Sequence, residues 1–346
     1  MKVALLTDKF ATGGGLEHIY QLCRGMPDVQ FGVFGKDGEA REKFAAMPNI
    51  QLFFDTEVRT VNAFGPDIVH YHHLRPLLST SMPRARSLFT VHGVHLHKFE
   101  FQSGLRAKLG RMARLVLEKF LYRRVDRFIT VSTEDRAFLL QHYGVDSTTI
   151  YNGIDFAPIE QARGPKEALR RCLGLPLNKQ IYLTVARFDF PKGYDVLVHA
   201  IAQLQRENAA NDRVFVFAGD GALLEATQAL AASLGVSGHI MFLGRRTDVY
   251  KLMTAADVFV LPSRWEGLPL TLIEALVARL PAVASRTYGN ATVQRETGDN
   301  VRLFENENPS DLAHALQHPP SFTPCDLAPF QLAKMVESTR KVYLDQ

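Results

Sequence analysis

The chain has 346 residues, of which 46% are hydrophobic and 22% are charged, and its formal net charge is +4. This ordinary composition is enough for about two domains. The three cysteines lie far apart and form no C-x-x-C pair, which argues against a disulfide framework or a thiolate zinc site. The first residues are charged too early for a signal peptide, and no apolar run approaches the roughly 18 residues that span a bilayer. We therefore expect a cytoplasmic protein.

The first half of the chain alternates short apolar runs with helical or loop segments. Residues 2–7 are the first expected strand, and a Thr-Gly-Gly-Gly loop at 12–15 leads into a helix. The spacing of a dinucleotide-binding G-x-G-x-x-G motif is absent, so a tight turn and a phosphate or substrate contact through Gly14 and Gly15 both remain open. Further strands are expected at 31–34, 51–53, 68–71, 87–91 and 127–131. This alternation predicts an open α/β sheet.

Two of these strands end in groups of histidines, at 70–73 and at 92–97. Such groups raise the hypothesis of a zinc or two-metal hydrolase. No acidic residue is interleaved in either group, although metal hydrolases usually use carboxylates as ligands or as partners of the ligands. We therefore favour polar residues that line a cleft at the carboxyl ends of the strands, with His92 on the catalytic face.

The stretch from Arg106 to Arg127 carries eight basic residues against only Glu118 and Asp126. Apolar residues recur within it at roughly helical spacing, which predicts a basic amphipathic helix. Such a helix could lie on an anionic membrane surface or hold an anionic acceptor. The alternative is a solvated helix whose apolar side packs on the sheet. Nucleic acid is disfavoured, because no recognised binding motif or stacking platform accompanies the charge.

The α/β pattern starts again after the Asn-Gly turn at 152–153, where we place a domain boundary. Strands are expected at 180–185, 213–218, 239–243 and 258–261. The loop after the first of these strands holds Arg187 and Lys192. Two cations in a loop at the end of a parallel strand could clamp a diphosphate from two sides.

The stretch from 261 to 280 has the pattern strand, loop, helix. Pro269 lies where the first turn of a helix favours proline, and the apolar residues after it recur at helical spacing. A helix N-terminus after a parallel strand is a ready anion site. Glu266 in the loop and Glu274 in the helix are suited to accept hydrogen bonds from sugar hydroxyls.

Three features of the second half now agree in order and spacing: Ala-Arg…Lys-Gly at 186–193, Gly-Asp-Gly at 219–221, and two glutamates separated by seven residues at 266–274. Together they closely resemble the retaining, nucleotide-sugar-dependent glycosyltransferases of family 4, which have the GT-B fold. Weaker matches in the first half lie at 14–17, 90–92, 130–132 and 151–155. The resemblance implies an α/β protein of two Rossmann-like domains that face each other across a cleft. It places the acceptor domain at 1–153, with a returning helix at about 329–346, and the nucleotide-sugar domain at 154–328.

The resemblance also implies roles for the matching positions. Arg187 and Lys192 would hold the donor diphosphate and offset charge on the departing nucleotide. Glu266 would face the donor sugar, and Glu274 would accept hydrogen bonds from ribose hydroxyls. His92 would lie near the donor sugar and the acceptor hydroxyl. The further donor-side positions are Gly14, Gly15, Gly219, Gly244, Arg245, Gly267 and Leu268, and the acceptor-side positions are Glu17, His72 and His95.

The expected reaction is front-face transfer with retention, without a protein nucleophile, a metal or a cofactor. The expected donor is a UDP-sugar, and the acceptor is a cell-envelope glycan, lipopolysaccharide or glycolipid, met in the cytoplasm or at the inner face of the membrane. Many relatives have Gly-Phe-Gly after the first glutamate where this chain has Gly-Leu-Pro, which leaves the sugar open. The alternatives are a nucleotide-sugar epimerase, a phosphorylase, or a sugar-nucleotide binding protein without turnover.

Overall fold

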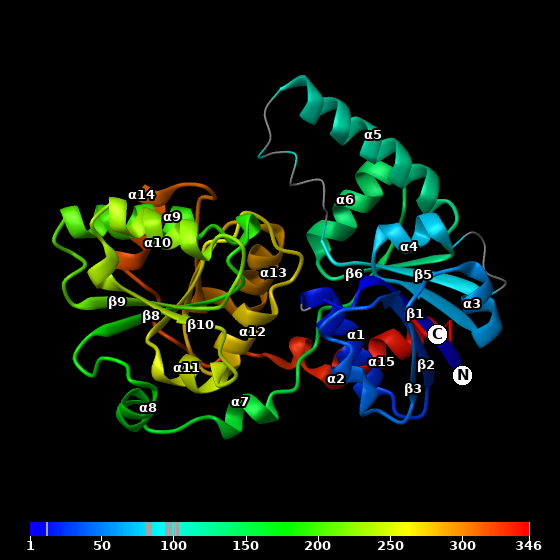
Figure 1. Ribbon diagram of the computed structural model, residues 1–346, viewed down its shortest axis with the longest axis horizontal. Coiled ribbons are helices and arrows are strands. Elements are labelled where there is room, and N and C mark those ends of the chain that lie inside the picture. Colours follow the sequence, from blue (N-terminus) through cyan, green and yellow to red (C-terminus); the bar gives the residue numbers. More distant parts are fainter. Residues whose placement is uncertain (12, 81–84, 94–98, 100, 102–103, 346) are drawn as a thin grey trace. The chain divides into compact units, whose positions relative to one another are not determined.

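A computed structural model describes residues 1–11, 13–80, 85–93, 99, 101 and 104–345 (Figure 1). Its internal contacts divide the chain into two compact units. Unit 1 comprises Met1–Ile154 and Ala328–Gln346, and unit 2 comprises Asp155–Leu327. Each unit is an α/β domain built on a parallel sheet, so the predicted pair of Rossmann-like domains is confirmed. That they face each other across a cleft stays a prediction.

The sheet of unit 1 has the strand order β3-β2-β1-β4-β5-β6-β7, and all its pairs are parallel. Its central strands are apolar and buried along nearly their whole length, as a sheet covered on both faces requires. The strands are β1 (Lys2–Lys9), β2 (Gln30–Lys36), β3 (Ile50–Phe53), β4 (Ile68–Tyr71), β5 (Arg86–Val91), β6 (Arg127–Thr130) and β7 (Thr148–Thr149).

The helices of unit 1 include one that returns from the far end of the chain. The helix α15 (Leu332–Tyr343) lies beside α1 (Gly14–Gly25), with Met335 in the same apolar core as the first strands (Figure 1). Its Tyr343 hydroxyl lies 2.8 Å from Nδ1 of the buried His70 at the end of β4. The remaining helical segments are α2 (Glu42–Ala45), α3 (Val58–Phe64), α4 (Leu74–Ser79), α5 (Leu105–Tyr122), α6 (Thr133–Tyr143) and the short 3-10 segment η5 (Ala328–Phe330).

The sheet of unit 2 has the order β10-β9-β8-β11-β12-β13, again with parallel pairs. Its strands are β8 (Gln180–Val185), β9 (Arg213–Ala218), β10 (Ile240–Gly244), β11 (Val258–Leu261), β12 (Ala282–Ser285) and β13 (Val301–Phe304). The last two are not among the strands predicted from the sequence. Both have only four residues, and the Ala-Val-Ala-Ser of β12 is half alanine, which has a weak strand preference. Pairing with β11 and β13 stabilises β12 despite its composition.

The helices of unit 2 connect these strands. They are α7 (Ala157–Gln161), α8 (Lys166–Leu173), α9 (Tyr194–Arg206), α10 (Leu224–Ser233), α11 (Val249–Ala255), α12 (Leu270–Val277), α13 (Tyr288–Thr297) and α14 (Pro309–Gln317), with 3-10 segments η2 (Phe190–Lys192), η3 (Ser237–His239) and η4 (Gly298–Asn300). Pro269 lies just before α12 in an extended conformation, and its carbonyl accepts the amide of Ile273. It is therefore the capping residue and not the first helical one.

Candidate functional site

In unit 2 the strand order reverses between β8 and β11, which are neighbours although β9 and β10 separate them in sequence. Loops at the carboxyl ends of two such strands diverge and leave a crevice where ligands bind in open α/β sheets. The loop after β8 carries Arg187 and Lys192, and the loop after β11 carries Glu266. Strand order therefore brings together residues that lie far apart in the chain.

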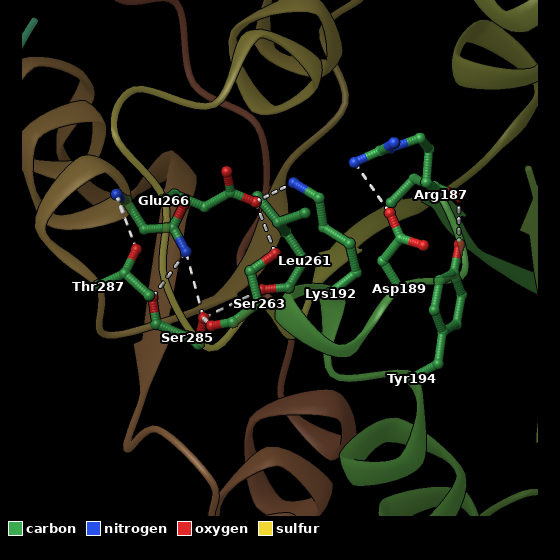
Figure 2. A network of polar contacts seen from close by, with 11 residues as sticks. Arg187, Asp189, Lys192, Tyr194, Leu261, Ser263, Glu266, Ser285 and Thr287 are labelled. Carbon is green, nitrogen blue, oxygen red and sulfur yellow. Dashed lines mark hydrogen bonds and ion pairs between the residues drawn. The ribbon is translucent and has the colours of Figure 1, made fainter. Parts of the chain in front are cut away.

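Lys192 and Glu266 meet directly at this point. The Lys192 Nζ lies 2.6 Å from Glu266 Oε1, and the Ser263 hydroxyl donates to the same oxygen at 2.6 Å (Figure 2). Gly193, next to Lys192, has φ +62°, and a Cβ there would collide with the Pro262 carbonyl oxygen. Only glycine allows the two loops to approach this closely. The result is a fixed ammonium–carboxylate pair at the end of the sheet.

The Glu266 loop is also held from its other side. The hydroxyl of Ser285, at the end of β12, donates to the Ser263 carbonyl. A Cβ on Gly289, in the first turn of α13, would collide with the Gly267 carbonyl oxygen, so this helix packs tightly on the loop. Both contacts come from segments after residue 280. Strand β12, which was not predicted from the sequence, therefore helps to hold the loop that carries Glu266.

Arg187 lies nearby but makes different contacts. Its guanidinium is paired with Asp189 at 2.8 Å, and its side chain is 62% exposed (Figure 2). The Tyr194 hydroxyl donates to the Ala186 carbonyl at 2.9 Å and ties the base of this loop to α9. Arg187 is therefore an exposed cation at the rim of the loop, whereas Lys192 is three-quarters covered.

The buried Arg264 connects the two loops, and the sequence analysis missed it. Its guanidinium donates to the Phe190 carbonyl at 2.7 Å and to both carboxylate oxygens of Asp195, at 3.0 and 2.6 Å. It also pairs with Glu307 at 2.8 Å. Its position in a loop directly after a buried strand is a signal that sequence reasoning could have used. Arg264 holds the Lys192 segment against the Glu266 segment.

Other predicted positions lie on the neighbouring loops of unit 2. Glu274 is in the second turn of α12, and the Tyr250 hydroxyl donates to its Oε1 at 3.3 Å. The amide of Gly219 donates to the Gly244 carbonyl at 2.8 Å, which joins the ends of β9 and β10. Arg245 follows as an exposed side chain, and Gly267 and Leu268 precede α12.

In unit 1 the strand order reverses between β1 and β4, and the predicted N-terminal positions gather there. Gly14 and Gly15 begin α1, and a Cβ added to Gly15 would contact the rings of His73 and His92. The His72 Nδ1 lies 3.0 Å from the His92 Nε2. Gly15, His72 and His92 are therefore neighbours, although β1, β4 and β5 carry them to this point separately.

Two acceptor-side predictions have a different outcome. Glu17 forms an ion pair with Lys43, and its Oε1 accepts a hydrogen bond from Gln21 at 2.8 Å. Its carboxylate is therefore engaged by its own helix and by the segment that carries α2. His95 lies outside the described residues, so the structure gives it no position.

A further histidine, which the sequence analysis did not select, joins this group. His18 lies one turn into α1, its Nδ1 is 2.9 Å from the Asn152 Oδ1, and its ring lies 4.8 Å from that of His92. Burial lowers the pKa of His18 to about 4, and burial together with the neighbouring imidazoles lowers the pKa of His72 well below its ordinary value. These rings are neutral at neutral pH.

Most of the basic stretch at 106–127 forms the helix α5. Its buried side carries Ala107, Glu118 and Leu121, and Glu118 pairs with Arg114 and accepts from the Tyr143 hydroxyl. Six other large apolar residues of the helix are exposed: Leu105, Leu109, Met112, Val116, Leu117 and Phe120. The alternative that the apolar side packs on the sheet therefore holds for Leu115 and Leu121, which lie at the core of unit 1, but not for these exposed residues.

None of the helices among the described residues is both long enough and apolar enough to cross a membrane.

Comparison with protein families matches most of the chain in two parts. The model of Glycosyltransferase Family 4 matches residues 12–157, and that of Glycosyl transferases group 1 matches residues 165–318. The second match contains Lys192, Glu266 and Glu274, and the first contains Gly15 and His92.

Individual relatives carry the same description. A UDP-Gal:alpha-D-GlcNAc-diphosphoundecaprenol alpha-1,3-galactosyltransferase from Escherichia coli is 29% identical over 247 residues, which cover 70% of this chain and 63% of the relative. The putative glycosyltransferase EpsD of Bacillus subtilis is 32% identical over 263 residues, 71% of this chain and 65% of the relative. The matched part is thus slightly less than two thirds of each relative's length.

Solved structures share the whole architecture. The crystal structure of Anabaena HepE in complex with UDP and glucose matches with a TM-score of 0.79 and 19% identity over 100% of both chains. Sucrose-phosphate synthase from Thermosynechococcus elongatus matches with a TM-score of 0.77 and 21% identity over 99% of this chain and 98% of that one. At these identities the likeness shows the fold.

Proposed function

The chain belongs to the family-4 glycosyltransferases of the GT-B fold, and from this membership we propose that it transfers a sugar with retention from a nucleoside diphosphate sugar to a hydroxyl group. The observation that carries the proposal is the Lys192–Glu266 pair at the point where the strand order of unit 2 reverses. A cation and a carboxylate fixed there can address the two parts of a nucleotide sugar, its charged diphosphate and its hydroxylated ring.

The donor would bind along the carboxyl ends of β8 and β11. Lys192 has three N–H donors, so it can keep Glu266 and still contact a phosphate oxygen. Arg187 at the rim and the backbone amides of Gly267 and Leu268 before α12 would add to the positive potential that holds the diphosphate. Glu274 would accept from ribose hydroxyls, and Gly244 and Arg245 would lie by the base. We favour UDP, a preference supported by the UDP named in the HepE structure and in the E. coli relative.

The chemistry that we propose uses charge and position without a protein nucleophile. The Glu266 Oε1 already accepts from Lys192 and Ser263, which makes it a weak nucleophile and leaves Oε2 to accept from sugar hydroxyls. Lys192 and Arg187 would stabilise the departing diphosphate, whose oxygen would take the acceptor proton on the same face of the sugar. His92, from unit 1, would lie on the acceptor side. In this scheme fixed cations supply the charge that a metal would otherwise supply.

A screen of nucleoside diphosphates tests this proposal directly. We expect UDP to raise the midpoint of thermal unfolding in a concentration-dependent way, because a ligand that binds only the folded state stabilises it. The nucleoside diphosphate that raises the midpoint most then decides which nucleotide sugars are tested as donors for turnover. If no nucleoside diphosphate moves the midpoint, the proposed donor site is wrong.

Turnover assays with the best donor then separate the alternatives on this fold. A nucleotide-sugar epimerase would release an altered sugar nucleotide without any acceptor, and a phosphorylase would need inorganic phosphate. A binding protein would show the thermal shift without turnover. The name of the E. coli relative makes a lipid-linked diphosphate sugar a suitable first acceptor, next to lipopolysaccharide and other envelope glycans.

We also propose that α5 brings the acceptor side of unit 1 to an anionic membrane. Leu109, Met112, Val116 and Phe120 recur every three or four residues, so they share one side of the helix, and each is more than half exposed. Basic residues flank this stripe: Lys108, Arg111, Lys119, Arg123 and Arg124. An exposed apolar stripe between cations is the pattern of a helix that lies in the interface of an anionic bilayer.

Vesicle binding tests the role of this stripe. We expect the protein to bind vesicles that contain an anionic lipid and to be released at high salt, which shortens the screening length. Replacing Val116 and Phe120 together by glutamate should weaken binding at least about tenfold, because two apolar side chains lose their burial. The matched control is Leu177→Glu, which alters an exposed leucine of unit 2. Equal binding to neutral and anionic vesicles would contradict the proposal.

A further inference from the structure

Three imidazoles meet at the point in unit 1 where the strand order reverses. His18 comes from α1, His72 follows β4 and His92 follows β5, and one ring nitrogen of each lies within 4.8 Å of the others. We propose that these three residues form a binding site for a divalent transition-metal ion, with Zn²⁺ favoured, and that the ion inhibits sugar transfer when it is bound. None of the three is among the donor residues proposed in unit 2.

The spacing of the nitrogens fits a metal with small adjustments. Two nitrogens bound to one tetrahedral zinc ion lie about 3.3 Å apart, as zinc–nitrogen bonds of about 2.0–2.1 Å require. The His72 Nδ1 and His92 Nε2, at 3.0 Å, are already close to this separation. The nitrogens lie within 4.8 Å of one another, so binding must shorten the widest separation by up to about 1.5 Å through movement of the rings.

Asn152 prepares His18 for this role. The Asn152 Oδ1 can only accept, so the His18 Nδ1 at 2.9 Å carries the hydrogen and the Nε2 keeps its lone pair. A partner on the second ring nitrogen that fixes the tautomer is the usual companion of a metal-binding histidine. Asn152, in the Asn-Gly turn at 152–153, thus orients His18, a role that could not be predicted from the sequence.

The two ring nitrogens of His72 have different surroundings. Its side chain is 2% exposed, and its Nε2 is buried without a hydrogen-bond partner among the described residues. An imidazole binds one ion through one nitrogen, so with Nδ1 as the ligand the Nε2 carries the hydrogen and faces away from the ion. The only other contact of the ring's nitrogens that the structure gives is the one to His92.

The group also has the right protonation and access. Burial keeps the pKa values of His18 and His72 below neutrality, so both rings offer lone pairs at neutral pH without losing a proton. His92 is partly exposed and gives an ion a route from solvent. Three histidines leave a fourth position for water, as in open zinc sites.

Inhibition follows from the role proposed for His92. This step rests on the proposed function, in which His92 would lie on the acceptor side. An ion bound to His92 would occupy its lone pair and the space beside Gly15, which lies against the same ring. The metal site itself rests only on the geometry of unit 1.

The test uses the full chain stripped of metal and titrated with Co²⁺, whose tetrahedral complexes absorb visible light, and with Zn²⁺ by calorimetry. We expect one ion per chain, Zn²⁺ displacing Co²⁺, and a loss of more than about tenfold in affinity for His92→Gln, since even outer partners of metal ligands are worth that much. His72→Gln should weaken binding similarly, with circular dichroism to verify its fold. The control His314→Gln/His318→Gln removes an exposed pair, one in α14 and one at its C-cap, whose rings lie 5.2 Å apart.

Each outcome decides a separate point. Failure to bind either ion, unchanged binding by His92→Gln, or binding lost in the α14 control would overturn the metal site. Zn²⁺ that binds with full affinity but leaves transfer unaffected would overturn the inhibition alone. If no donor gives transfer, the proposed function fails, and the Co²⁺ spectrum still decides whether the site exists.

Discussion

Replacing Lys192 by alanine is expected to lower turnover at least about 10²-fold, because a fixed charge aimed at a departing group usually supplies the largest single share of catalysis. The ammonium is held 2.6 Å from Glu266 and three-quarters covered, so solvent screens it less than an exposed lysine. The effect should fall mainly on kcat, since the charge on the leaving diphosphate grows as the glycosidic bond breaks. Initial rates with a saturating donor measure it.

Two further variants make this result specific. Lys251→Ala removes an exposed lysine from α11 and should leave the rate unchanged. Glu266→Gln keeps the size of the side chain but removes the partner's charge, so the double variant with Lys192→Ala shows whether the two residues act as one unit. If the rate loss of the double variant equals the product of the losses of the two single variants, the two residues act independently, which would count against a shared site. Near-normal activity of Lys192→Ala would count against it as well.

The local half of this site could be read from the sequence. An apolar run that stops at a proline, followed by helical periodicity, places Glu266 in a loop and Glu274 in a helix. The same reasoning places Lys192 at the end of another strand. The pairing of Lys192 with Glu266 could not be read, because it depends on β8 lying next to β11, and strand order is a tertiary choice that residue spacing does not encode.

The missed residues share this cause. His18 lies within the amphipathic pattern of α1, and its partner Asn152 is 134 positions away. Arg264 looks like a loop cation, and only the structure shows that two carboxylates and a carbonyl surround it. The stripe on α5 illustrates the limit of periodicity. A 3.6-residue repeat shows that one side of a helix is apolar, but it does not show what covers that side.

Acidification is expected to unfold unit 1 before carboxylates titrate, because two of its histidines are buried in the neutral form. Burial lowers the pKa of His18 from 6.5 to about 4 and that of His70 to about 3. The unfolded chain therefore binds more protons than the folded one below pH 6.5. The stabilisation is present in full above that pH and is lost as the pH falls toward the folded pKa values.

The size of the loss is comparable with the stability of a domain. Each histidine contributes about 1.4 kcal/mol per pH unit, so two of them lose about 5 kcal/mol between pH 6.5 and 4.5. Small domains have about 5–15 kcal/mol in total. His72, whose pKa is also lowered by burial, adds to the effect.

The chain contains its own reference for this measurement. Trp265 is the only tryptophan and lies in unit 2, whereas the buried histidines lie in unit 1. Far-ultraviolet circular dichroism should therefore report unfolding in acid before tryptophan fluorescence changes. His70→Gln removes one titrating ring, so the slope of unfolding free energy against pH should fall by about 1.4 kcal/mol per unit, whereas His199→Gln, on an exposed position of α9, should leave the slope unchanged. If His70→Gln leaves the slope of the unfolding free energy against pH unchanged, this ring is not held neutral by burial. The slope measures how many more protons the unfolded state binds than the folded state, so removing such a ring must lower it.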